Sequence, residues 1–194
     1  MSTIPIFANE SWRLPSRGRV GMFGLIIGES AIFTIFVVAY VYYIGRSLYG
    51  PTPKILEVPI FNSICLLSSS ITIILAEHAI ARGLMRRFAA LWGLTMALGI
   101  EFLIGTGIEW HKLIFEDHLT IRTNLFGTTY YSLVGLHATH VVVGMLGLSL
   151  VMIFTLMGRV KQEHAERIQV LALYWHFVDA VWVVVFTVVY IVGR

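Results

Sequence analysis

The chain has one cysteine and few charged residues. Of its 194 residues, 13% are charged, whereas a soluble globular domain has about a quarter. Because Cys65 has no second cysteine to pair with, the chain forms no internal disulfide. A thiolate-ligated copper or iron–sulfur centre would need more sulfur than one thiol. The net charge of +3 gives no basis for binding nucleic acid.

Apolar residues are what the chain has in excess, at 57% of the total. They gather in five stretches, each near or above the ~20 residues that a membrane-spanning helix needs. No repeat, low-complexity segment or soluble linker separates them. The sequence therefore predicts an all-α, polytopic membrane bundle of five transmembrane helices that forms a single membrane domain over residues 1–194. The expected spans are about 20–44, 58–81, 88–110, 126–157 and 168–192.

Basic residues are unevenly divided between the two sides of this bundle. Nine lie in the segment before the first span and in the second and fourth loops, and five lie on the other side. By the positive-inside rule, the N-terminus is expected to be cytoplasmic and the C-terminus outside. Residues 1–19 contain Glu10 and two prolines instead of a continuous apolar run, so we expect a retained cytoplasmic tail and no cleaved signal peptide.

Small and acidic residues mark the first span. Gly21, Gly24 and Gly28 follow one another at three- and four-residue steps and share one helix face. Such a face lets another helix approach closely, either from the same chain or from a partner subunit. Glu29 lies well inside the span, where a carboxyl group is costly. It is either a neutral acid hydrogen-bonded to a neighbouring helix or a group that handles protons or anchors lipid.

Histidine and aspartate recur in the last two spans. His137 and His140 are one helical turn apart and could face one metal, and His176 and Asp179 are spaced i, i+3. No Glu-x-x-His repeat of a di-iron bundle occurs. Neutral histidines that hydrogen-bond between helices are the favoured interpretation. We therefore expect His137, His140, His176 and Asp179 to form one polar cluster that joins the fourth and fifth spans.

Two further pairs of ionisable residues lie in the second and third spans. Glu77 and His78 are adjacent, so their side chains point about 100° apart and cannot share a face. Glu101 and Glu109 are about two turns apart and do share a face. Each of these two is expected to find a hydrogen-bond donor on a neighbouring helix.

Four segments together resemble subunit III of the haem–copper terminal oxidases. Residues 174–182, including Trp175 and Trp182, match that family's last-helix signature Tyr-Trp-His-Phe-Val-Asp, and residues 135–144 are similar to its glycine–histidine segment. Residues 56–78, which end in Glu77-His78, resemble another family helix. Gly21-Met22 with Glu29-Ser30 resembles the helix that carries the family's intramembrane glutamate. The four occur in the family's order and cover most of the chain.

The resemblance implies a non-catalytic accessory role in a respiratory complex that reduces oxygen to water and pumps protons. Haems and copper would be in partner subunits, with none in this chain. Subunit I would be the main contact, with subunit II and a small subunit IV in the same complex. Bound phospholipid, support of proton uptake and protection of the core are also implied, in the bacterial plasma membrane. Glu29, Glu77 and His78 would couple to lipid or to subunit I, and Trp175 and Trp182 would serve packing.

The chain also departs from the family, and other readings stay open. Mitochondrial members have seven helices, whereas this chain begins at what would be the third and resembles the five-helix bacterial form. A related accessory protein of a nitric oxide reductase would share the same motifs. A proton-coupled transporter could use Glu29, Glu101 and Asp179, although no inverted repeat or broken helix is evident. A membrane metalloenzyme would use His137, His140 and His176.

Overall fold

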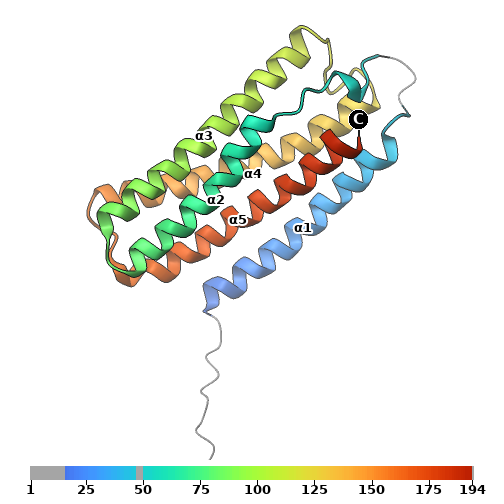
Figure 1. Cartoon of the computed structure of the whole chain (residues 1–194). Coiled ribbons are helices and arrows are strands. Elements are labelled where there is room, and N and C mark those ends of the chain that lie inside the picture. Colours follow the sequence, from blue (N-terminus) through green and yellow to red (C-terminus); the bar gives the residue numbers. More distant parts are fainter. Residues whose placement is uncertain (1–15, 47–49, 194) are drawn as a thin grey trace, which may run out of the picture.

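A computed structural model describes residues 16–46 and 50–193. Its described part contains helices and no strand, and five of the helices are long and apolar enough to cross a membrane (Figure 1). The predicted fold class is therefore confirmed. The five are α1 (Arg17–Tyr43), α2 (Ile60–Ala81), α3 (Met85–Phe115), α4 (Leu125–Leu156) and α5 (Ala165–Phe186). Two short 3-10 helices, η1 (Pro53–Ile55) and η2 (Gln162–His164), precede α2 and α5, and the π-helix η3 (Thr187–Val192) continues α5.

The helices extend beyond some of the expected spans. α3 begins at Met85 and ends at Phe115, whereas hydropathy placed that span at 88–110. Polar residues such as Lys112 end an apolar stretch but continue a helix, since a helix can protrude from the bilayer. Arg17 and Arg19, assigned to the tail by sequence, are already helical in α1. The rest of the expected tail, residues 1–15, lies outside the described residues.

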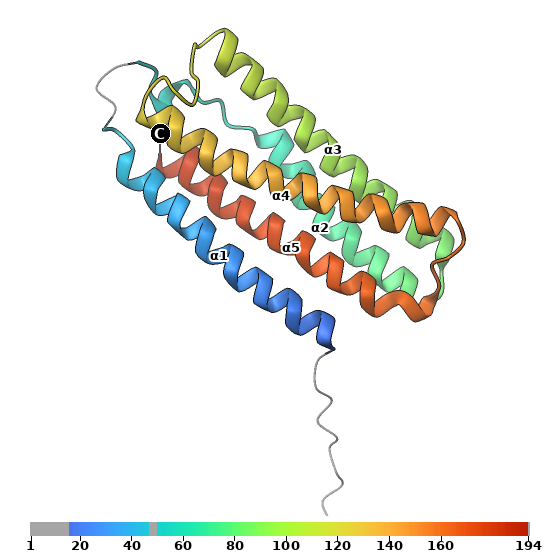
Figure 2. The same cartoon turned by 180° about the vertical axis from the view of Figure 1, so that it is seen from behind.

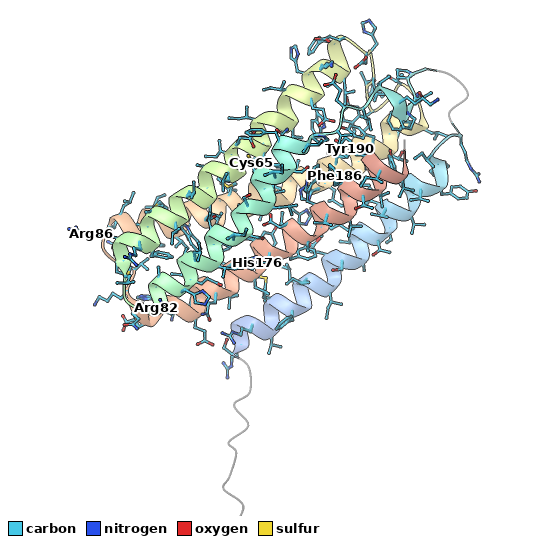
Figure 3. The ribbon with its side chains drawn as sticks, viewed as in Figure 1. Cys65, Arg82, Arg86, His176, Phe186 and Tyr190 are labelled. Atoms are coloured by element: carbon cyan, nitrogen blue, oxygen red, sulfur yellow. The ribbon has the colours of Figure 1, made fainter. Side chains whose placement is uncertain are left out.

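Alternate connections meet at the same end of the bundle. The start of α1 and the α2–α3 and α4–α5 connections lie at one end, and the remaining connections lie at the other with the end of η3 (Figures 1 and 2). Figure 3 shows Arg82 and Arg86 at the first end and Tyr190 near the second. The larger and the smaller group of basic residues counted in the sequence thus lie at opposite ends of the bundle. Arg13 and Arg194, which belong to that count, lie outside the described residues.

The helices differ widely in how much of each is covered. In an apolar stretch of 18 residues within the last span, which contains α5, half of the residues are buried. In the corresponding stretch of α1, 6% are buried. Three fully buried tryptophans hold the centre, and each donates its indole N–H across helices: Trp92 to the Leu148 carbonyl at 2.9 Å, Trp175 to Ser69 Oγ at 2.8 Å and Trp182 to Ser63 Oγ at 3.1 Å. In a low-dielectric interior an unpaired N–H is costly, so these bonds fix how α3 packs on α4 and how α5 packs on α2.

Glycines allow the Trp175 ring to fit between α3 and α4. A Cβ added to Gly99 would lie 2.9 Å from the ring, and one added to Gly144 would lie 2.8 Å from it. No larger residue fits at either position without displacing the indole. The short Trp-His-Phe-Val-Asp segment of α5 is therefore held against glycine surfaces on two neighbouring helices.

Candidate functional site

A glutamate and a histidine meet between α1 and α4. Glu29 Oε2 lies 3.1 Å from His140 Nε2, and His140 Nδ1 lies 2.8 Å from the Leu136 carbonyl oxygen. A carbonyl oxygen only accepts, so Nδ1 carries a hydrogen. The contact between Nε2 and Oε2 then needs one further hydrogen, either on the carboxyl group or on the imidazole. Glu29 and His140 consequently share one proton within the membrane-spanning region.

The surroundings of this pair are partly open. The Glu29 side chain is 28% exposed and that of His140 13% exposed. The Phe33 ring lies 5.0 Å from the His140 ring, and Tyr174 Oη donates to the His140 carbonyl at 3.3 Å. An intramembrane carboxyl group has thus found its partner on another helix, while one side of the pair stays accessible from outside the bundle.

A second polar group links α2 to α5. His176 Nδ1 lies 3.1 Å from Ser70 Oγ, and the Ser70 hydroxyl donates to Asp179 Oδ2. Because the one hydroxyl hydrogen goes to Asp179, Ser70 Oγ accepts from His176 Nδ1–H. Asp179 is 3% exposed, whereas Ser70 and His176 are half-buried, so the chain runs from the partly exposed His176 through Ser70 into the interior at Asp179.

His137 lies apart from both groups. It is fully buried, stacks on Trp182 with ring centroids 4.9 Å apart, and meets Phe102 edge-on at 5.8 Å. Neither of its ring nitrogens has a hydrogen-bond partner among the described residues.

The single cluster expected from the sequence is therefore corrected. Three residues of helix rotate a side chain by about 300°, so His137 and His140 point to different neighbours. His140 reaches α1, and His137 reaches aromatic rings of α3 and α5. His176 and Asp179 hydrogen-bond to α2. Among the described residues, no hydrogen bond joins either of the two histidines on α4 to His176 or Asp179 on α5, so the four residues do not form one cluster.

The glycine face of α1 is open. A Cβ on Gly21, Gly24 or Gly28 would meet no atom within 4 Å, so no other helix of the described chain packs there. The sequence left open whether this face packs against a helix of the same chain or of a partner subunit. At these three positions the structure shows no packing against a helix of the same chain.

Glu77 and His78 lie near the end of α2 that carries the excess of basic residues. The His78 side chain is exposed, and its Nδ1 lies 2.8 Å from the Ile74 carbonyl oxygen. Glu77 is half-buried and close enough to Arg19 of α1 for an electrostatic interaction. This group is separate from Glu29.

At the opposite end of the bundle, the sequence predicted a hydrogen-bond donor for Glu109 but did not identify the residues that supply it. Glu109 Oε1 accepts hydrogen bonds from Tyr190 at 2.8 Å and from Tyr130 at 3.2 Å. Lys112 pairs with Glu57, and that ammonium group holds the pKa of the Glu57 carboxyl below its ordinary value of 4.5. Glu109 thus found the donors that its spacing predicted. The tyrosines gave no signal because aromatic residues at helical spacing are ordinarily packing residues.

The geometry of the site leaves the family open, and a sequence comparison decides it. Among the described residues, no three His, Cys, Asp or Glu side chains are placed to hold one metal ion. The profile of the family described as "Cytochrome c oxidase subunit III" matches residues 16–194. The chain belongs to this family. The resemblance drawn from residues 21–30, 56–78, 135–144 and 174–182 is confirmed.

Named relatives agree with the family match. The chain is 31% identical over 177 residues to cytochrome c oxidase subunit 3 of Alkalihalophilus pseudofirmus, covering 90% of this chain and 86% of the relative. It is 29% identical over 195 residues to that of Bacillus sp., covering 98% and 94%. It is 36% identical over 183 residues to that of Synechocystis sp., covering 88% and 75%. Subunit III relatives of similar length and wide distribution therefore align over nearly the whole bundle.

Proposed function

We propose that this chain is the non-catalytic accessory subunit of a haem–copper respiratory oxidase in the bacterial plasma membrane, with its N-terminus cytoplasmic. Haems and copper are in partner subunits, where oxygen is reduced and protons are pumped. Subunit I is the main contact, and subunit II and a small subunit IV complete the complex. The family match over residues 16–194 supports this role, and the relatives' names favour cytochrome c as the electron donor.

The Glu29–His140 pair carries the more specific part of the proposal. It holds one shared proton, joins α1 to α4 and is partly accessible from outside the bundle. Ionisable groups inside the membrane mark functional sites by default. We propose that the pair supports proton uptake by subunit I and positions phospholipid on α1. Glu77 and His78, near the basic end of α2, then contact lipid headgroups or subunit I.

Purification of the tagged chain from its native membranes tests the assignment. In mild detergent we expect it to carry haem, seen in a reduced-minus-oxidised spectrum, together with larger membrane subunits and retained phospholipid in native mass spectrometry. A complex with Glu29→Gln should lose activity after fewer turnovers than one with Glu163→Gln, which alters an exposed loop carboxylate. A preparation without haem protein would contradict the proposed function.

A further inference from the structure

A groove lies between α3 and the segment that leads into α2, separate from the Glu29–His140 pair. Its cavity volume is about 320 Å³, and Asn62 is the residue of α2 that lines it. We call it the α2–α3 groove and define it by Glu57, Glu101, Ile104, Ile108, Glu109 and Lys112. Figure 1 shows α2 and α3 side by side, with α3 continuing past the start of α2.

The α2–α3 groove runs from one membrane surface towards the middle of the bilayer. At about 1.5 Å of rise per residue, Glu101 lies about 13 Å from the nearer end of the expected span 88–110, which is close to the middle of the bilayer. Lys112 and Glu57 lie at the end of the groove near the membrane surface. Since the hydrocarbon core is about 30 Å thick, Glu101 lies too deep for a lipid headgroup.

The lining of the groove is acidic. Four carboxyl groups face it, those of Glu57, Glu101, Glu109 and Asp117, against the single amine of Lys112. Lys112 is already paired with Glu57. The charge of the groove is therefore complementary to a cation that comes from outside the chain.

Glu101 has a buried oxygen without a partner. Glu29 is bonded to His140, Glu109 to two tyrosines and one oxygen of Asp179 to Ser70. Glu101 Oε2 and Asp179 Oδ1 are both buried without a hydrogen-bond partner among the described residues, and of these two carboxyl groups only that of Glu101 lines the groove. The neighbouring Cys65 thiol is only a weak donor. A buried carboxyl oxygen at this depth needs a donor. The Asn62 amide lines the same groove, yet no donor among the described residues is bonded to Glu101 Oε2.

We propose that the α2–α3 groove receives an arginine or lysine side chain from a neighbouring membrane-spanning subunit. The inference rests on the proposed function, because it requires that the chain work within a membrane complex. The incoming cation pairs with Glu101 in the depth of the groove. Ile104 and Ile108 at its rim are 58% and 65% exposed and offer an apolar surface to the helix that carries the cation. Paired charges are how membrane interiors tolerate ionised side chains.

Site-specific cross-linking in the intact complex tests which molecule occupies the groove. A photoreactive amino acid replaces Ile108, and a control replaces Leu146 of α4, which is 66% exposed. At position 108 we expect a cross-link to a protein segment that spans the membrane and contains arginine or lysine, and at position 146 we expect none to that segment. Cross-links from position 108 to lipid alone would overturn the proposal.

Substitution of Glu101 tests the charge. Glu101→Gln keeps the shape but removes the charge, and loss of one partner of a buried charge pair weakens binding by about tenfold or more. We expect the fraction of chain released from the complex by graded detergent to rise accordingly, and to rise further for Glu101→Lys. Glu116→Gln, which alters an exposed carboxylate beyond α3, should release no more than the unaltered chain. The thermal unfolding of each isolated chain shows whether the variant is folded.

The two proposals fail in different ways. If the unaltered chain purifies with haem-bearing subunits but Glu101→Gln is retained as tightly as Glu116→Gln, the groove inference is wrong and the oxidase assignment stands. If the chain purifies without haem but position 108 cross-links to a basic spanning segment, the assignment is wrong and the groove inference stands.

Discussion

α5 and α1 are both apolar helices of spanning length, yet they are attached to the bundle in different ways. α5 is half buried and hydrogen-bonds through Trp175, Trp182 and Asp179 to α2. α1 buries only Phe33 and Tyr40 and has two side-chain hydrogen bonds to the rest of the described chain, Glu29 to His140 and Arg19 to Gln169. Two helices of similar hydropathy can therefore have different roles in the bundle. α5 organises the packing of the other helices, whereas α1 presents an exposed surface to the surroundings of the chain.

Removing a large side chain from each helix should show the greatest contrast. Trp175→Ala empties a fully buried site and breaks the bond to Ser69, so we expect it to lower the free energy of unfolding by about 3–5 kcal/mol. Phe23→Ala on α1 removes a ring that is 51% exposed and should cost less than about 1 kcal/mol. Denaturant titration of the isolated chain in micelles measures both. Equal losses would show that α1 is as tightly packed as α5.

Adding a methyl group tests the same contrast from the opposite direction. Gly144→Ala brings a Cβ to 2.8 Å from Trp175, which should destabilise the chain by about 1–3 kcal/mol. Gly24→Ala meets nothing within 4 Å and should leave the isolated chain as stable as before or slightly more so. Thermal unfolding followed by circular dichroism distinguishes them. A destabilised Gly24→Ala chain would mean that this face is covered within the chain.

A double-mutant cycle sharpens the description of how α1 is held. Glu29→Leu and His140→Leu each break the same contact, so their effects should be coupled by about 0.5–1.5 kcal/mol. The cycle of Glu29→Leu with His176→Leu is the control, since His176 bonds to Ser70 on another helix. Coupling as large in the control cycle would contradict the separation of the two polar groups.

The smallest effect is expected away from both helices, at the Glu57–Lys112 ion pair. The pKa of Glu57 is lowered by Lys112, so the pair stabilises the folded chain above the ordinary pKa of 4.5, and that contribution is lost as pH falls through the lowered value. Lys112→Met should return the Glu57 pKa towards 4.5 in a carbon-detected NMR titration. An unchanged titration would show that the two side chains do not pair in solution.

The sequence predicted the fold because spanning length and apolar composition are one-dimensional properties. It also identified Glu29, His140, His176 and Asp179 as the residues that need partners, since ionisable groups in a membrane are conspicuous. It did not predict their partners. Ser70 bonds through its hydroxyl and Leu136 through its backbone carbonyl, and neither group distinguishes these residues from other serines or other backbone positions in the sequence. Which helix each side chain faces depends on how the helices pack, and the sequence does not give that arrangement. The open glycine face and the α2–α3 groove likewise follow from packing.

Amide hydrogen exchange followed by mass spectrometry tests the division of roles between the two helices most directly. In the isolated chain, peptides from α1 should exchange faster than peptides from α5, because few contacts hold α1 to the bundle. In the intact complex, α1 should become protected while α5 changes little. Equal protection of α1 and α5 in the isolated chain, with no gain for α1 in the complex, would contradict the proposal that α5 organises the bundle and α1 is a surface for other components.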